Sequence, residues 1–137
     1  MDIEAIRATI KNLPQKYEPL LLTFYGSEAY LDQDLVVLGD DYGTKICLDV
    51  TDGCLYSVDP ENHLSSRFLN SSIDHFAKFL VRYTEYEKQV AEAAAEEVQV
   101  QLVGKLREQF LAIDERAISG PETWWTLVLE QAKHGLL

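Results

Sequence analysis

The chain has 137 residues, and we expect residues 1–137 to form a single domain with a buried core. This length is too short for a large multidomain enzyme. Hydrophobic residues make up 47% of it and charged residues 26%, an ordinary globular composition that argues against disorder. With 23 acidic and 12 basic side chains, its net charge of −11 disfavours direct binding to nucleic acid or to an anionic membrane, because both need Lys and Arg. Such a charge suits a basic partner.

The first half of the chain predicts one helix and a series of strands. Apolar residues spaced three or four apart from Ile3 to Leu13 predict an amphipathic helix, and Pro14 is expected to end it. Apolar or alternating runs predict strands over residues 20–25, 35–38, 44–50 and 54–58, with a short fifth at 68–69. We expect turns over 39–43 and at Asp52-Gly53, which is a strong hairpin signal.

The hydrophobic pattern takes a helical period after residue 70. Ser71 or Ser72 is expected to cap a helix whose apolar face runs over 73–83. A second helix, with apolar residues spaced by four, is expected over 90–106, and a last one over 119–135. Strands grouped before helices predict an α+β fold: a mainly antiparallel sheet with an N-terminal helix and C-terminal helices packed against it.

The chain carries no pattern for export or membrane insertion. No basic region followed by an apolar stretch opens it, so no secretory signal is expected. No apolar segment approaches the roughly 18 residues that a membrane span requires. Cys47 and Cys54 flank the Asp52-Gly53 turn out of register, so we expect two reduced thiols in the core of a cytoplasmic protein.

Most catalytic signatures are absent. The segment 39–45 has the wrong glycine spacing for a phosphate loop and carries two carboxylates that would repel phosphate. No metal-ligand spacing joins the three histidines, His63, His75 and His134. We therefore expect no catalytic residue, metal or cofactor. A hydrolase is the remaining enzymatic alternative, in which carboxylates such as Asp40 and Asp49 would meet across neighbouring strands.

Residues 26–66 are the most acidic part of the chain, with nine acidic residues and one basic one. Such a block is either an ordinary soluble surface or a docking surface for a basic protein, where opposite charges speed association. Tyrosines in the same block favour an interface, because they combine an apolar face with a polar tip. Chosen for charge and expected exposure, the candidate partner-binding residues are Asp40, Asp41, Tyr42, Asp49, Asp52 and Tyr56.

Several segments together resemble the SUKH superfamily, most closely its fourth subfamily. The resemblance covers roughly residues 35–137. Its most specific part is a strand-turn-strand unit followed by an Asn-Ser-Ser helix start. The residues that carry it are Gly39-Asp40-Asp41-Tyr42-Gly43, Ile46-Cys47-Leu48-Asp49, Gly53, Tyr56, Phe68-Leu69-Asn70-Ser71-Ser72-Ile73, Phe76, Leu80, Asp114, Trp124-Trp125, Leu129-Glu130 and Gly135-Leu136.

The resemblance implies a non-enzymatic α+β protein that works by binding. Many bacterial members are immunity proteins, each of which binds and blocks the toxin encoded beside it, and these toxins are often nucleases or nucleic-acid deaminases with basic clefts. Other members are regulators or scaffolds, and a homo-oligomer is also open. The resemblance implies that Asn70-Ser71-Ser72 caps a helix and that Trp125 fills the core. Adjacent tryptophans point about 100° apart on a helix, so we expect one of Trp124 and Trp125 in the core and the other at the seam between helix and sheet. With Trp125 in the core, the seam falls to Trp124.

Overall fold

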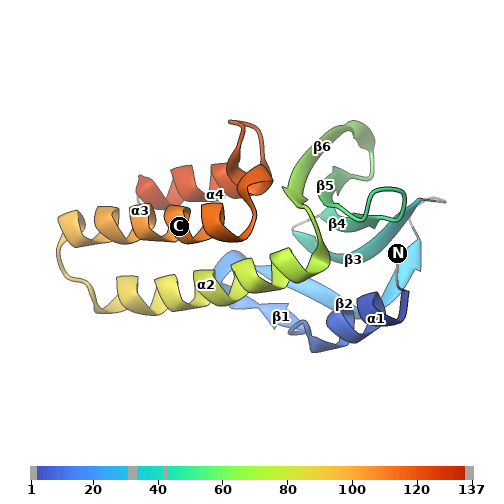
Figure 1. The fold of residues 1–137 in the computed structure, drawn as a ribbon, viewed down its shortest axis with the longest axis horizontal. Helices are drawn as coiled ribbons and strands as arrows, with labels where there is room; N and C mark the ends of the chain where they lie inside the picture. Colours follow the sequence, from blue (N-terminus) through green and yellow to red (C-terminus); the bar gives the residue numbers. More distant parts are fainter. Residues whose placement is uncertain (1–2, 31–33, 42, 135–137) are drawn as a thin grey trace.

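The computed structural model describes residues 3–30, 34–41 and 43–134. It is an α+β fold, as predicted, with a six-stranded antiparallel sheet in which each strand pairs with its neighbour in the chain (Figure 1). The strands are β1 (Lys16–Tyr17), β2 (Leu22–Tyr30), β3 (Leu35–Asp41), β4 (Thr44–Asp49), β5 (Leu55–Asp59) and β6 (Asn62–Asn70). The helices are α1 (Ile3–Asn12), α2 (Ile73–Glu92), α3 (Glu96–Ile113) and α4 (Trp124–Lys133), with 3₁₀ turns η1 (Glu18–Leu20) and η2 (Glu115–Ile118).

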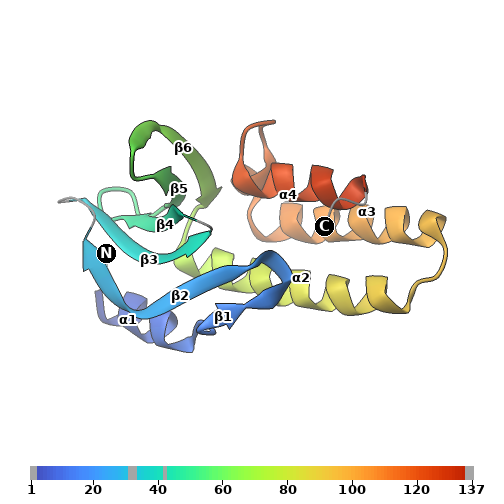
Figure 2. The ribbon, with the colours of Figure 1, turned by 180° about the vertical axis from the view of Figure 1, so that it is seen from behind.

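The sheet and the longer helices occupy opposite sides of the molecule. The predicted N-terminal helix exists as α1, which packs on β2 and α2, but most of the helical residues are C-terminal (Figure 2). Helices α2 and α3 form a hairpin, and α4 lies alongside α3 (Figures 1 and 2). Helices α2 and α4 both contact β6, and the first half of α2 also packs on the sheet through Phe76 against Phe24 of β2 and through the carbonyl of Leu80, which accepts from Tyr17 of β1. The far end of α2 and the start of α3 extend beyond the sheet (Figure 1).

An aromatic cluster joins the two sides. Trp125 is fully buried, with its ring 5.3 Å from that of Phe79 and 5.1 Å from that of Phe110, both edge-on. Phe79 and Phe110 stack face to face at 3.9 Å. Phe76 continues the cluster toward the sheet, where its ring meets that of Phe24 in β2. One hydrophobic core therefore connects the sheet with the helices, and Trp125 lies inside it, as expected.

The strands are longer than the apolar runs predicted. Strand β2 starts at Leu22 and continues through Tyr30, and β3 extends through Asp41 instead of turning at Gly39. Gly39 is needed inside the strand, because a Cβ there would lie 2.1 Å from the carbonyl oxygen of Thr23 on β2. The expected short strand at 68–69 is the nine-residue β6, whose polar first half is held by pairing with β5.

The helix boundaries also differ from the prediction. The helix expected over 90–106 is two helices, because α2 continues through Glu92 and the backbone turns extended at Ala93 and Ala95. Helix α4 begins after Thr123, whose side chain accepts a hydrogen bond from the Thr126 N–H, and not at residue 119. Its predicted end at Gly135 lies outside the described residues.

Two local predictions are confirmed. Ser72 caps α2, and its hydroxyl accepts a hydrogen bond from the His75 N–H at 3.1 Å. Cys47 stands opposite Tyr56 in the β4–β5 register, two positions from any pairing with Cys54, and both cysteines are buried without a disulfide.

Candidate functional site

The structure divides the predicted partner-binding residues between opposite ends of the sheet. Asp40 and Asp41 lie at the β3–β4 turn, and Tyr42 in that turn is outside the described residues. Asp49, Asp52 and Tyr56 surround the β4–β5 turn at the other end of β4, roughly 17 Å away for a six-residue strand. The five of these residues that the structure describes therefore do not form one site.

The register also contradicts the suggested carboxylate pair. Asp40 stands opposite Lys45, whereas Asp49 stands opposite Leu35 at the far end of the same two strands. The idea that Asp40 and Asp49 meet across neighbouring strands was wrong, because β3 is longer than its apolar run and separates the two carboxylates. The hydrolase alternative therefore loses the pair of carboxylates, Asp40 and Asp49, that was suggested for it.

At the β4–β5 turn, the carboxylates shape the backbone. Asp49 accepts hydrogen bonds from the backbone N–H and the hydroxyl of Thr51, at 2.8 Å and 2.5 Å. Asp52 accepts from the Cys54 N–H at 2.8 Å and from the Tyr56 hydroxyl at 2.7 Å. Burial alone would raise the pKa of Asp52, but these two donors stabilise its charged form and the pKa lies below its ordinary value. Both carboxylates therefore have a structural role in this turn.

At the β3–β4 end, Asp40 and Asp41 point to opposite faces of the sheet. The outer face is the one that carries Val37, Cys47 and Val58, and the inner face is the one that packs into the main core. Asp40 shares the outer face with its register partner Lys45, while Asp41, the next residue, faces inward. Adjacent residues that look alike in the sequence thus have different surroundings.

On the outer face, Asp40 belongs to a small exposed network. The Tyr25 hydroxyl donates to Asp40 at 2.9 Å, and Lys45 Nζ lies 3.8 Å from the same carboxylate. Lys45 also donates to the Tyr25 hydroxyl at 3.1 Å, a hydrogen bond that raises the pKa of Lys45 more than its slight burial lowers it. Tyr25 is 40% exposed, so an aromatic ring and a charge pair are presented together.

On the inner face, Asp41 lines a cleft between the sheet and α4. The cleft has a volume of about 550 Å³ and combines apolar walls with the charged groups of Asp41, Asp59 and Arg67. We call it the α4 cleft; its walls include Leu20, Leu21, Thr44, Trp124, Leu127 and Val128. Trp124 thus occupies the expected seam between helix and sheet, and its indole N–H donates to Asp41 at 3.2 Å.

The surroundings of Asp41 disfavour the charged form of its carboxyl group. Burial raises the pKa of Asp41 above its ordinary value, the Trp124 hydrogen bond opposes that shift, and neighbouring Asp40 adds to it. Two basic side chains of this region contact other carboxylates: Lys45 is paired with Asp40, and Arg67 Nη1 lies 3.4 Å from Glu122. Asp41 is therefore a partly buried carboxylate with a neutral hydrogen-bond donor.

Leu21 marks the rim of the α4 cleft. It has φ 55° and ψ 38°, a left-handed conformation that non-glycine residues adopt at a cost, and its side chain is 57% exposed. It also lines a second hollow of about 320 Å³ that reaches Lys16, Glu18 and Asp40. A strained backbone thus presents a large apolar side chain between two hollows.

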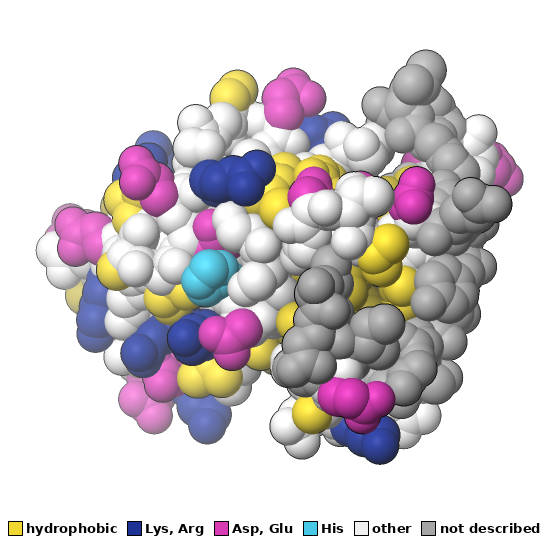
Figure 3. Space-filling model, turned by 45° about the vertical axis from the view of Figure 1, so that its right-hand side comes forward, with side chains coloured by type: hydrophobic (Ala, Val, Ile, Leu, Met, Phe, Trp, Pro, Cys, Tyr) yellow, Lys and Arg dark blue, Asp and Glu magenta, His cyan; other side chains and the backbone are white. Residues whose placement is uncertain are grey.

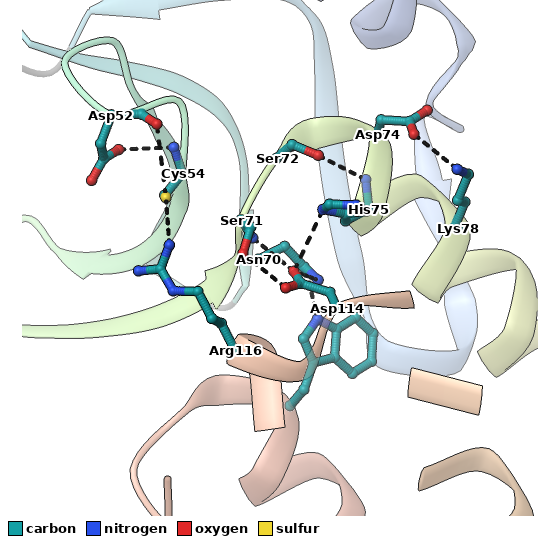
Figure 4. Close-up of polar contacts among 11 residues, drawn as sticks. Asp52, Cys54, Asn70, Ser71, Ser72, Asp74, His75, Lys78, Asp114 and Arg116 are labelled. Carbon is teal, nitrogen blue, oxygen red and sulfur yellow. Dashed lines mark hydrogen bonds and ion pairs between the residues drawn. The ribbon is translucent and has the colours of Figure 1, made fainter. Parts of the chain in front are cut away.

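A buried network around Asp114 was missed as a unit by sequence reasoning (Figure 4). The Asp114 carboxylate accepts hydrogen bonds from the Asn70 amide at 3.1 Å, the Ser71 N–H at 2.7 Å and the Ser71 hydroxyl at 2.8 Å. Asn70 accepts in turn from the Trp125 indole at 2.9 Å. These residues join the end of β6 to α3 and α4. Ser71 was expected only as a possible helix cap and Trp125 only as a core residue, while Asn70 and Asp114 appeared within the resemblance. No spacing rule joins Asn70 to Asp114, which lie 44 positions apart.

Charge is not gathered into one patch on the face drawn in Figure 3. Asp and Glu side chains there are spread among Lys, Arg and hydrophobic side chains. Within the described ranges, no group of three or more His, Cys, Asp or Glu residues is placed to hold a metal ion. Nor does any helix in that part of the chain have the length and hydropathy needed to cross a bilayer.

Comparison with known protein families assigns the chain to one of them. The SUKH-4 immunity protein family model matches residues 26–131, a range that includes the sheet from within β2 onward and most of α4. The chain belongs to this family. The match confirms the resemblance seen in the sequence. It covers the Asp114 network of this SUKH-4 protein and the α4 cleft from Asp41 onward, whereas the cleft residues Leu20 and Leu21 precede the matched range. No curated protein and no solved structure matches the chain.

Proposed function

We propose that this SUKH-4 protein neutralises a cognate bacterial toxin by direct protein–protein contact in the cytoplasm, without chemistry of its own. The family match supports immunity as the role. The net charge of −11 supports a basic toxin domain, of the nuclease or nucleic-acid deaminase type, whose own substrate is a polyanion.

Two features favour the β3–β4 end of the sheet as the contact surface. Leu21 is 57% exposed and lines both hollows, and Tyr25 is 40% exposed and donates to Asp40, which lines the smaller hollow. Such a mixture of apolar anchors and charge is typical of interfaces. At the other end, Asp49 and Asp52 already accept hydrogen bonds within their own turn. The observation that carries this choice is the exposed, left-handed Leu21 between the hollows.

Growth rescue tests the role. The toxin domain encoded beside the gene is expressed from an inducible promoter, with or without this protein. We expect growth only when this protein is present, and the purified pair should elute as one complex whose stoichiometry light scattering gives. A regulatory scaffold of the same fold would bind other partners and would leave the toxin lethal, which would reject the proposal.

Association kinetics test the surface. Replacing Asp40→Lys should slow association with the toxin domain by about fivefold or more at low salt, because a steering charge is reversed beside Lys45. Added salt should slow the wild-type protein toward the rate of the variant. Asp74→Lys is the matched control, because Asp74 is an exposed carboxylate on α2. Equal slowing by both variants would reject the β3–β4 end as the contact surface.

A further inference from the structure

The α4 cleft contains two carboxylates that no described basic residue neutralises. Asp41 and Asp59 both line it, and among the residues the structure describes neither forms an ion pair. Arg67 also lines the cleft, but its guanidinium donates to the carbonyl oxygen of Glu122 at 3.0 Å and lies beside that residue's carboxylate. Asp59 accepts a hydrogen bond from the Glu61 N–H at 2.9 Å and Asp41 one from the Trp124 indole, so each carboxylate has a neutral donor and no ion pair among the described residues.

The register places the two carboxylates on either side of a short side chain. Asp41 pairs with Thr44 on β4, and Thr44 lies one position beyond the Lys45–Val58 pair, which brings it opposite Asp59 on β5. Two strand spacings separate Asp41 from Asp59, or about 10 Å between their Cα atoms. Thr44 between them is small, so a planar group entering the cleft can reach both carboxylates.

We propose that the α4 cleft is a socket for one arginine side chain projecting from the partner protein. This inference rests on the proposed function, since the partner supplies the arginine. The guanidinium carries a fixed charge and a planar set of N–H donors that matches two carboxylates, whereas a lysine ammonium is a compact, strongly hydrated point charge. Leu21 and Trp124 line the cleft, where they would pack on the aliphatic part of the arginine.

Several properties of the protein fit this occupant. Burial raises the pKa of Asp41 above its ordinary value, so a cation bound beside this carboxylate would stabilise its charged form. The apolar walls lower the local dielectric constant and strengthen attraction for that cation. The left-handed backbone of Leu21 leaves its side chain 57% exposed, so an apolar surface is accessible beside the two carboxylates.

Nuclear magnetic resonance with a small probe tests the socket without the toxin. The probe is N-acetyl-arginine methylamide, and the controls are the uncharged citrulline analogue with matched salt and the lysine analogue. The Trp124 indole N–H, identified by its loss in Trp124→Phe, reports binding because it contacts Asp41. We expect a saturable shift with a dissociation constant in the millimolar range for the arginine probe, and no saturable shift for citrulline.

Variants locate the charge that binds. Asp41→Asn and Asp59→Asn should each weaken the arginine probe by about fivefold or more, since each removes one carboxylate from the cleft. Asp52→Asn should leave the affinity within about twofold, because Asp52 lies at the other end of the sheet. A proton–nitrogen spectrum of each variant verifies folding, and Asp59→Asn keeps the test valid if Asp41→Asn is misfolded.

The outcomes separate the socket from the proposed function. Equal shifts by arginine and citrulline probes, wild-type affinity in both carboxylate variants, or tighter binding of the lysine probe would each overturn the arginine socket. None of these results affects growth rescue by the wild-type protein. Loss of rescue would instead reject the immunity role, even if the arginine probe bound.

Discussion

Trp124 and Trp125 are neighbours on α4, yet their indole N–H groups meet two very different carboxylate environments. Trp125 donates to Asn70, which donates to Asp114, a buried carboxylate with three hydrogen-bond donors around it. Trp124 donates to Asp41, which is half-buried in a cleft and has a raised pKa. The first environment satisfies its charge and holds the fold together. In the second, the carboxylate has a single hydrogen bond from a described side chain, and this is the region where we propose that the partner binds.

The largest effect is expected in the Asp114 network. Asp114→Ala removes the acceptor shared by Asn70 and Ser71 and leaves buried donors unpaired, so the free energy of unfolding should fall by about 3–5 kcal/mol. Urea denaturation measures the change. Asp74→Ala is the matched control: its carboxylate is 70% exposed and pairs only with Lys78 in the next turn, so the loss should stay within about 1 kcal/mol. Similar losses in the two variants would remove the structural role of Asp114.

Replacing each tryptophan of α4 by phenylalanine tests, through unfolding free energies, whether Trp125 contributes more to stability than Trp124. Trp125→Phe loses a fully buried ring system and the hydrogen bond to Asn70, so we expect a loss of about 2–3 kcal/mol in unfolding free energy. Trp124→Phe should cost about 1 kcal/mol, because its indole lines the cleft and contacts a carboxylate that also faces solvent.

The same tryptophan pair should show the reverse order in toxin binding. At a temperature where both variants are folded, Trp124→Phe should raise the dissociation constant and Trp125→Phe should not, since only Trp124 lines the proposed contact surface. Calorimetric titration measures both constants. If Trp125→Phe weakened binding more than Trp124→Phe, the division of roles along α4 would be wrong.

The pH dependence of stability should have opposite signs for Asp41 and Asp52. The folded-state pKa of Asp41 is raised, so its charge opposes folding, and wild type should lose stability relative to Asp41→Asn as the pH rises through that pKa. The pKa of Asp52 is lowered by its backbone and tyrosine donors, so wild type should gain stability relative to Asp52→Asn over the acidic range.

Thermal unfolding of the three proteins between about pH 3 and pH 7 measures these slopes. Both effects should be the smallest of the set, near 1 kcal/mol or less for partly exposed groups. Slopes of the same sign for the two variants would show that Asp41 is as well satisfied as Asp52, and the contrast between the cleft and the turn would fail.

Local spacing of apolar and turn-forming residues was enough to predict most of the helices and strands and their order. The Ser72 cap, the hairpin after Asp49 and the order of strands before helices were predicted from residue type and period. Boundaries failed where tertiary contacts decide them. Strand β6 begins in polar residues that only pairing with β5 makes extended, and the Ala93–Ala95 turn interrupts a segment of good helix formers because α3 packs back on α2.

The candidate site was less predictable than the fold. Net charge and residue type indicated the acidic block as a candidate surface. The sequence predicted a turn at residues 39–43, so it could not show that Asp40 and Asp41 belong to β3 and face opposite sides of the sheet. Leu21 gave no signal either, since a left-handed leucine is not recognisable from its neighbours. Strand register and backbone conformation depend on distant strands, and they place some of the acidic residues in the α4 cleft and others in the β4–β5 turn.

Hydrogen–deuterium exchange of the protein alone and in complex with the toxin domain is the most direct measurement of where binding occurs. Binding at the β3–β4 end predicts slower exchange of the complex at residues 18–25, 39–45 and 124–131, with little change over 49–56. Protection confined to residues 49–56, or to the distal ends of α2 and α3, would contradict it.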